Sequence, residues 1–386
     1  MRKKMKILWF NWRCIKHPLA GGAEVYTHEI AKRLVKMGNE VILVTSRPKG
    51  LPKEEIIDGY KVIRAGGKYS VYYTARKIYR ELKRDGYRPD IVIDEVNTIP
   101  FFTPKYVNEP IYMLIHQLCK ECWRYAYNSV IEPFGWWLEK RFHRIYIDSV
   151  KNGKVKSVIT VSQSTKDDLI ELGYPEEKIS IVYNGIDWEF YKDCKNLAIK
   201  KEPIALYLGR ITPYKRIEDI LMAWKIVEEK SDNAYLIIAG RPDRRYLEKL
   251  IKLARKLRLR RVEFHTNISE YEKRMLLARA STLIYTSVRE GWGQTVLEAA
   301  ACKTPTIAYN VAGLKDSISH METGILIPPN DVTKLAYSIL DIISDNTLRD
   351  TVGNKAHKDV HKYSWENTAY TFIRTLNNSL KTNITS

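Results

Sequence analysis

Two glutamates, Glu290 and Glu298, flank a glycine-rich elbow with seven residues between them. A short apolar strand at 283–285 precedes the elbow, and an apolar helix starts near Gln294. Glycines such as Gly293 let backbone N–H groups approach a ligand, and a helix N-terminus attracts anions. Glu298, one turn into the helix, can accept hydrogen bonds from vicinal hydroxyls, and Glu290 faces the same predicted pocket. Together they indicate a site for a phosphorylated sugar or a nucleotide sugar.

A second segment carries cations at the end of a buried strand. Leu206-Tyr207-Leu208-Gly209 leads into Arg210, and Lys215 follows a proline-containing turn at the start of the next helix. Arginine offers a planar fork for phosphate oxygens and lysine a mobile point charge, so the pair can neutralise a diphosphate. A basic strand end is often only solvated, but the nearby glutamate elbow favours the binding interpretation.

Two further candidates lie in the first half of the chain. Gly21 and Gly22 follow the first strand and open the first helix, where a doubly wound domain presents amides to a phosphate. The full G-x-G-x-x-G spacing is missing, so a tight turn is an equal alternative. His116 ends the strand at 111–115 and could contact a sugar hydroxyl or donate to developing charge, or it could be structural.

The elements that position these residues alternate between short apolar runs and amphipathic stretches, which is typical of parallel sheets with crossover helices. We expect an α/β chain of two doubly wound, Rossmann-like units joined near 187–203, with a cleft between their ligand-binding edges. Strands are predicted near 6–11, 41–45, 61–65, 90–94, 111–115, 157–161, 179–183, 204–208, 234–239, 261–265, 282–286, 304–308 and 324–327. Helices are predicted near 22–37, 73–85, 128–150, 164–172, 215–229, 244–257, 270–279, 294–302, 313–319, 331–344 and 347–360.

Composition agrees with a globular two-domain protein inside the cell. The 386 residues exceed one ordinary core, and no run of about 18 uncharged apolar residues occurs. The apolar run after the basic N-terminus is too short for a secretory signal, so we expect a cytoplasmic location. Five scattered cysteines do not indicate a disulfide framework, and Cys119-x-x-Cys122 lacks the second pair that a zinc site needs.

The net charge of +19 indicates an anionic partner. The excess is spread over both halves, which argues against a nucleic-acid-binding tail. Two segments, 76–84 and 134–146, mix cations with apolar or aromatic residues and suit peripheral contact with anionic lipid. Alternatively, their cations cover a solvent face while the aromatics pack inward.

The combined motifs resemble those of glycosyltransferase family 4, the retaining glycosyltransferases of GT-B fold, over most of the chain. Glu290 to Glu298 is similar to the family's E-x7-E signature, and Arg210 with Lys215 to its phosphate-binding pair. Further matches are Gly21-Gly22-Ala23-Glu24, Asn184-Gly185-Ile186-Asp187, Gly313, Gly324 and Tyr363-Ser364-Trp365-Glu366. Three positions depart from the pattern: Lys303 and Arg216 stand where glycine is common, and Asp316 replaces a common glutamate.

The resemblance implies an acceptor-binding domain at 1–187, a nucleotide-sugar domain at 188–364, and a C-terminal helix, about 365–386, on the first domain. It also implies residue roles: Glu298 holds the donor ribose, Arg210 and Lys215 bind the diphosphate, and Glu290 lies by the donor sugar. By the same resemblance, the amides of Gly293, Gln294 and Thr295 line the sugar pocket, and His116 faces the reacting sugar.

The expected activity is that of a retaining hexosyltransferase moving sugar from a UDP- or GDP-sugar to a glycan or polyisoprenoid-linked acceptor. With no Asp-x-Asp pair to hold a divalent cation, we expect no metal and no cofactor. A sugar-nucleotide epimerase of the same architecture and a non-enzymatic nucleic-acid-binding protein are the alternatives. The sequence leaves the base, the sugar and the acceptor open.

Overall fold

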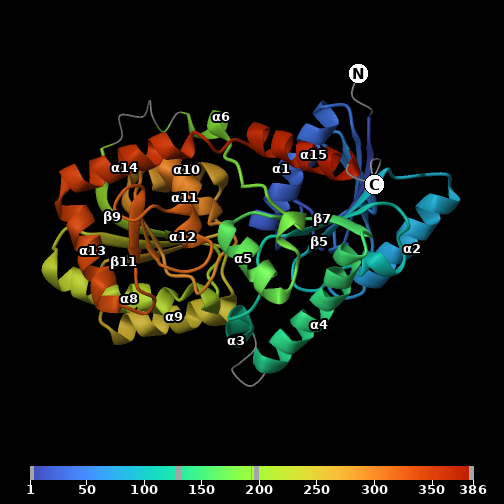
Figure 1. Ribbon diagram of the computed structural model, residues 1–386. Coiled ribbons are helices and arrows are strands. Elements are labelled where there is room, and N and C mark those ends of the chain that lie inside the picture. The colour runs from blue at the N-terminus through green and yellow to red at the C-terminus, as the bar shows by residue number, and fades with distance from the viewer. Residues whose placement is uncertain (1–3, 127–131, 193, 195–199, 382–386) are drawn as a thin grey trace. The chain divides into compact units, whose positions relative to one another are not determined.

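The computed structural model describes residues 4–126, 132–192, 194 and 200–381 (Figure 1). The chain divides into two compact units. The first comprises residues 1–120, 133–185 and 365–386, and the second comprises residues 121–132 and 186–364. The stretch that starts at Glu121 therefore groups with the second unit, although the sequence-based boundary places it within the first domain. Each unit contains one sheet with helices on both faces.

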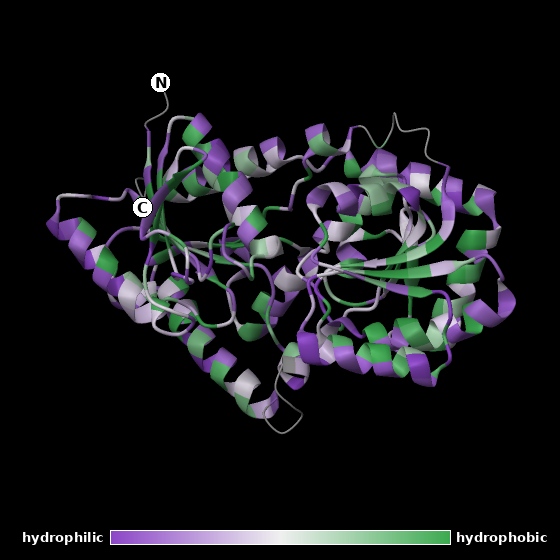
Figure 2. Cartoon of the chain, turned by 180° about the vertical axis from the view of Figure 1, so that it is seen from behind, coloured by the Kyte–Doolittle hydropathy of each residue, from purple (hydrophilic) through white to green (hydrophobic). Residues whose placement is uncertain are grey.

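The sheet of the first unit has strand order β3-β4-β2-β1-β5-β6-β7-β8. All neighbours pair in parallel except β3 and β4, which form an antiparallel hairpin at the edge. The strands are β1 Lys6–Phe10, β2 Glu40–Thr45, β3 Glu54–Ile57, β4 Tyr60–Arg64, β5 Ile91–Val96, β6 Ile111–Ile115, β7 Val155–Thr160 and β8 Ile179–Ile181. Hydrophobic residues fill most of these strands (Figure 2), as expected for a sheet covered on both faces.

Alternate residues of β1 contact different helices. Leu8 and Phe10 belong to a core shared with α2 and α4, whereas Trp9 stacks on Phe372 of α15 with 5.4 Å between ring centroids. The helices of this unit are α1 Gly22–Lys36, α2 Val71–Arg84, α4 Glu132–Lys151, α5 Gln163–Leu172 and α15 Trp365–Lys381, with 3-10 turns η1 Thr103–Lys105 and η2 Glu176–Lys178. The C-terminal helix is thus part of the first unit's fold.

The sheet of the second unit is entirely parallel, with strand order β11-β10-β9-β12-β13-β14. The strands are β9 Glu202–Leu208, β10 Tyr235–Gly240, β11 Val262–Thr266, β12 Ala280–Tyr285, β13 Thr306–Tyr309 and β14 Gly324–Ile327. Numbered from β9, this order is 3-2-1-4-5-6, the order of dinucleotide-binding sheets, which reverses direction between β9 and β12. Ligands of such sheets bind beyond the carboxyl ends of the strands at that reversal.

Helices cover both faces of the second sheet (Figure 1). The buried faces of α8, α9 and α13 share a core with β9 and β10. The helices of this unit are α3 Cys122–Ala126, α6 Trp188–Tyr191, α8 Ile217–Lys230, α9 Arg244–Lys256, α10 Glu270–Arg279, α11 Gln294–Ala301, α12 Leu314–Ser317, α13 Val332–Ser344 and α14 Asn346–Val360, with the 3-10 turn η3 Pro213–Lys215. None of the described helices is both long and apolar enough to span a bilayer.

Candidate functional site

The two motifs predicted to bind the donor follow the two strands at the reversal of the second sheet. Arg210 and Lys215 come after β9, and Glu290 comes after β12. Backbone and side-chain bonds join their loops: Val288 N–H donates to the Tyr214 carbonyl at 3.0 Å, and Thr286 Oγ1 donates to the Lys215 carbonyl at 2.8 Å. The chain's topology therefore places the two predicted motifs side by side.

Lys215 and Glu290 form an ion pair inside this junction. Lys215 is buried, and its Nζ also donates to the hydroxyl of Tyr285 at 3.0 Å. Burial lowers the pKa of Lys215, but Glu290 and the neighbouring tyrosines outweigh that effect, so the net shift of its pKa is upward. The lysine is therefore held as a cation, with a carboxylate as its partner.

Arg210 lies at the exposed rim of the same edge. Its Nη2 donates to the hydroxyl of Tyr214 at 2.8 Å, and the Tyr214 ring also lies 5.0 Å from Lys215 Nζ. The two cations thus share one tyrosine, one cation buried and the other exposed. This is an arrangement that can bind successive phosphates of a diphosphate.

Glycines shape the elbow that carries Glu290. Gly293 has φ +89°, which lies in the left-handed region. Helix α11 begins at the next residue, Gln294, and Thr295 follows in its first turn. At Gly313 (φ +81°), an added Cβ would lie 2.2 Å from the Glu290 carbonyl oxygen. Only glycine lets the chain come this close, so Gly313 fixes the path of the elbow. Because Gly293 has no side chain, it cannot cap the helix N-terminus that follows it.

Glu298 projects from α11 and pairs with a different cation. Its Oε1 accepts from Lys273 Nζ at 2.8 Å, whereas its Oε2 is buried without a hydrogen-bond partner among the described residues. Burial raises the pKa of Glu298, and Lys273 opposes that rise. A buried carboxylate oxygen without a donor is costly unless a ligand supplies one, as a ribose hydroxyl would.

His116 lies in the first unit, directly after β6, in a network built on a buried acid. Its Nε2 lies 3.1 Å from Glu95 Oε1. The other carboxylate oxygen, Glu95 Oε2, accepts two hydrogen bonds, one from Trp9 Nε1 at 2.8 Å and one from Thr27 Oγ1 at 2.5 Å. Glu95 is fully buried, and burial raises its pKa while His116 lowers it. The ring of Tyr26 meets His116 edge-on at 5.1 Å between centroids. The histidine ring is thus held in one orientation.

Gly21 is the N-cap residue of α1, which begins at Gly22, and it makes no side-chain cap hydrogen bond. The Gly21 amide donates to Glu24 Oε2 at 2.7 Å in a capping box, so this motif forms the start of a helix. Packing does not demand glycine at either position. A Cβ added at Gly21 would meet only the Glu24 carboxylate, at 3.7 Å, and a Cβ added at Gly22 would meet nothing within 4 Å. Phosphate binding by this pair stays a prediction.

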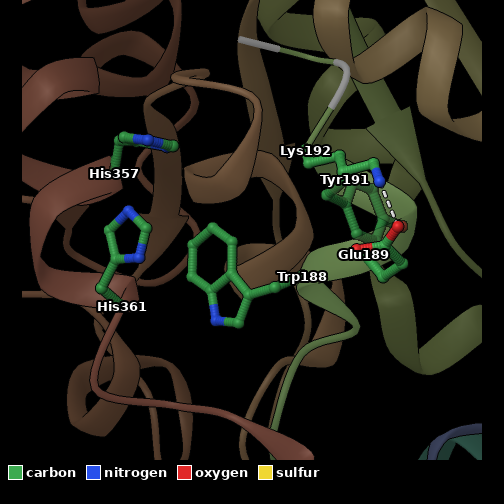
Figure 3. Close-up of a pocket in the computed structure, with 6 residues that line it drawn as sticks. All are labelled: Trp188, Glu189, Tyr191, Lys192, His357 and His361. Carbon is green, nitrogen blue, oxygen red and sulfur yellow. Dashed lines mark hydrogen bonds and ion pairs between the residues drawn. The ribbon is translucent and has the colours of Figure 1, made fainter.

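A cavity of about 330 Å³ lies elsewhere in the second unit, between α6 and α14. Figure 3 shows Trp188 between two histidines and Tyr191, with the His361 ring stacked on the indole at 4.1 Å. None of the predicted donor residues lines it: its walls are Trp188, Glu189, Tyr191, Lys192, His357 and His361. The described residues also contain no group of three or more His, Cys, Asp or Glu placed to hold a metal ion.

The sequence did not predict two residues that contact the candidate site residues: Glu95, which contacts His116, and Lys273, which contacts Glu298. Glu95 carried a usable signal, since Asp94 and Glu95 are adjacent acids within an otherwise apolar strand. Lys273 carried none, because one lysine in a helix of mixed charge does not reveal which carboxylate it reaches.

Comparisons with known proteins find two matching family models. Residues 20–190 match the model of Glycosyltransferase Family 4, and residues 191–359 match that of Glycosyl transferases group 1. The chain belongs to glycosyltransferase family 4. The enzyme is 28% identical over 384 residues to an uncharacterized glycosyltransferase of Methanocaldococcus jannaschii, covering 95% of this chain and 96% of the relative. It is 26% identical to the glycogen synthase of Mycobacterium tuberculosis, covering 88% and 86%.

Solved structures show the same fold. Sucrose-phosphate synthase from Thermosynechococcus elongatus superposes with a TM-score of 0.80 at 20% identity, covering 98% of this glycosyltransferase and 100% of that chain. Anabaena HepE, solved in complex with UDP-glucose, gives 0.73 at 18% identity, covering 97% and 100%. The expected GT-B class, with two Rossmann-like domains, and the expected transferase activity are both confirmed.

Proposed function

We propose that this glycosyltransferase moves a sugar from a nucleoside diphosphate sugar to an acceptor, with retention of anomeric configuration and without a metal ion. The supporting observation is the junction of the β9 and β12 loops, where Lys215 and Glu290 pair beside Arg210. Solved relatives bound to UDP or UDP-glucose support a nucleotide donor. Retention rests on the family resemblance.

The ion pair suggests how the donor would bind. Without ligand, the Glu290 carboxylate neutralises the buried Lys215 ammonium. An arriving diphosphate supplies that negative charge instead, which frees Glu290 to accept hydroxyls of the donor sugar. The difficult step is departure of the diphosphate while the sugar becomes oxocarbenium-like. Fixed cations and amide dipoles aimed at the leaving group stabilise the charge that then develops.

Glu298 would complete the nucleotide site. Its buried Oε2 lacks a donor among the described residues, and a vicinal diol supplies one, so we assign it to the ribose. In the same proposal the amides of Gly293 to Thr295 line the sugar pocket, and His116, held by Glu95, faces the reacting sugar.

The acceptor is proposed to be a polyisoprenoid-linked sugar at the cytoplasmic face of a membrane. On α4, Phe134 and Trp137 are 61% and 53% exposed, and their rings stack 5.8 Å apart between centroids. The neighbouring Lys140 and Arg141 are exposed as well. Exposed aromatics beside cations are suited to the interface of an anionic bilayer. On α2, Ile78 packs inward, so segment 76–84 supplies mainly charge, although Tyr73 near the start of the helix is 76% exposed.

Three substitutions test the donor site in a donor-turnover assay paired with nucleoside diphosphate binding. We expect Lys215→Ala and Arg210→Ala to lower turnover by about 10²–10³ and to weaken binding, because each removes charge from the leaving group. Glu290→Ala should lower turnover without weakening binding, because Lys215 then lacks its competing carboxylate. Lys225→Ala, which alters a partly exposed lysine paired with Glu229 on α8, is the matched control.

Near-wild-type transfer by all three site variants would end the assignment. Incubation of the donor alone separates the epimerase alternative, since a new nucleotide sugar without nucleotide release would indicate epimerisation.

A further inference from the structure

Two cysteines far apart in the sequence meet in the second unit. The Sγ atoms of Cys194 and Cys302 lie 2.8 Å apart, although 108 positions separate them in the chain. Cys302 is buried at the C-terminal end of α11, and Cys194, just beyond α6, is partly exposed. No disulfide joins them in this structure. A disulfide needs about 2.05 Å between sulfurs, so the two atoms would approach by less than about 1 Å.

Lys201 contacts the backbone beside these thiols. Its Nζ donates to the Cys302 carbonyl at 3.0 Å and to the Leu277 carbonyl at 3.3 Å. Burial lowers the pKa of Lys201 to about 8, although the adjacent thiols act to raise it. Burial and the neighbouring Cys194 thiol raise the pKa of Cys302, and the positive charge of Lys201 opposes that rise.

We propose that Cys194 and Cys302 are an oxidation site that forms an intrachain disulfide with a small-molecule disulfide as oxidant. Cys194, the more exposed thiol, loses its proton and attacks one sulfur of the oxidant, which releases one thiol and leaves a mixed disulfide. Cys302 then loses its proton, attacks the Cys194 sulfur and expels the second thiol. The two protein thiols lose two protons and two electrons, and the oxidant becomes two thiols.

The position of the bond determines its effect. It would join the segment after α6 to the end of α11, closing a loop that contains β9 to β12 and helices α8 to α11. A cross-link over so long a loop restricts the unfolded chain, and we expect the second unit to melt about 5–10 °C higher when oxidised. This inference does not depend on the identity of the sugar donor.

The test uses the purified full chain equilibrated with oxidised or reduced glutathione. Free thiols are alkylated, and the protein is digested without reduction and mapped by mass spectrometry. We expect a Cys194–Cys302 cross-linked peptide, two fewer alkylated cysteines and a higher melting temperature in the oxidised sample. Cys194→Ser and Cys302→Ser should each abolish the cross-link and the shift, whereas Cys119→Ser should retain both.

Two results would overturn the proposal. One is a full set of five alkylated cysteines after oxidation. The other is a glutathione adduct or a cross-link at other cysteines in place of the Cys194–Cys302 bond. Because the wild-type peptide map decides the question by itself, poor folding of a serine variant leaves the test intact.

Discussion

At the scale of single residues, the proposed nucleotide-binding role of Glu298 would depend on its pairing with Lys273. Burial raises the pKa of Glu298 above its ordinary value, and Lys273 opposes the rise. The carboxylate is ionised, and able to accept two hydroxyls, only above that raised pKa. Lowering the pH through this pKa protonates the Glu298 carboxylate, which then accepts hydrogen bonds less well. The affinity for the sugar donor should therefore decline at acid pH.

Replacing Lys273 with methionine tests this dependence. The carboxylate loses its charged hydrogen bond, so we expect nucleoside diphosphate affinity to fall by about 10- to 100-fold. The pKa of Glu298 rises further, so the acid-side loss of affinity begins at a higher pH than in wild type. Titration calorimetry from pH 5 to pH 8 measures both effects.

A 2′,3′-dideoxy analogue of the nucleotide is the control for the Lys273→Met experiment. Wild type and variant should bind it with similar affinity, because it lacks the hydroxyls assigned to Glu298. An equal penalty for both nucleotides would mean that Lys273 acts elsewhere, for instance on the phosphates or on folding.

The difference between what sequence predicted and what it missed is clear among these residues. Glu290 and Lys215 stood out because glycine and charge patterns at strand ends are local signals. Their ion pair depends on strands β9 and β12 being neighbours in the sheet. Because 71 residues lie between the end of β9 and the start of β12, only the fold brings these strands together. Lys273 and Glu95 act on residues from other elements, and one sequence does not specify such pairings.

At the scale of elements, two departures from the family pattern have a backbone explanation. Arg216 and Lys303, which stand where glycine is common, have φ of +53° and +55°. This left-handed conformation costs a non-glycine residue roughly 1–2 kcal/mol. Arg216 offsets the cost with contacts of 3.0 and 2.8 Å to the buried Asp219. No such ion pair of Lys303 is found within the described part of the chain.

We therefore expect opposite outcomes at these two positions. Lys303→Gly should stabilise the second unit by about 1 kcal/mol or less, since relief of backbone strain exceeds the entropy that glycine adds to the unfolded chain. Arg216→Gly should destabilise it by about 1–3 kcal/mol, because Asp219 loses its cation. Denaturant unfolding monitored by circular dichroism compares both with wild type. A loss of stability in Lys303→Gly would contradict the strain argument.

The exposed face of α4 carries the membrane prediction. Phe134→Ser with Trp137→Ser should weaken binding to vesicles of phosphatidylcholine and phosphatidylglycerol by about tenfold, because two interfacial aromatics are lost. Co-sedimentation of the protein with these vesicles measures the binding. Tyr271→Ser, which alters a 59% exposed aromatic of the second unit, is the matched control and should bind like wild type. Equal binding by all three proteins would remove α4 from the proposed contact.

Elements were predicted where periodicity and length agreed, as in the alternating strands and helices of the second unit. The antiparallel strand β3 was missed because Glu54-Glu55 begins it with two charges, and an exposed edge strand lacks an apolar signature. The helix predicted at 128–150 partly lies outside the described residues, which resume at Glu132. Both cases show that edges and boundaries depend on tertiary neighbours.

At the scale of the whole molecule, the last helix completes the fold of the first unit. Helix α15 places Phe372 flat against Trp9 of the central strand β1, and the Leu376 carbonyl accepts from the hydroxyl of Tyr112 at 2.7 Å. Glu366 at its start pairs with Arg33 of α1 at 2.6 Å. Residues 1–185 therefore do not contain the complete core of their own unit.

Phe372→Ala tests this dependence in the full-length chain. Phe372 is fully buried, so the substitution should cost about 3–5 kcal/mol, through lost burial and the cavity left beside Trp9. Hydrogen exchange should then speed up in β1, β5 and β6 of the first sheet, with β9 and β12 of the second sheet unchanged, because their core lacks α15. Tyr370→Ala, at a 49% exposed position of the same helix, should leave both sheets protected. Equal loss of protection in both sheets would show that α15 stabilises the molecule as a whole and not one unit.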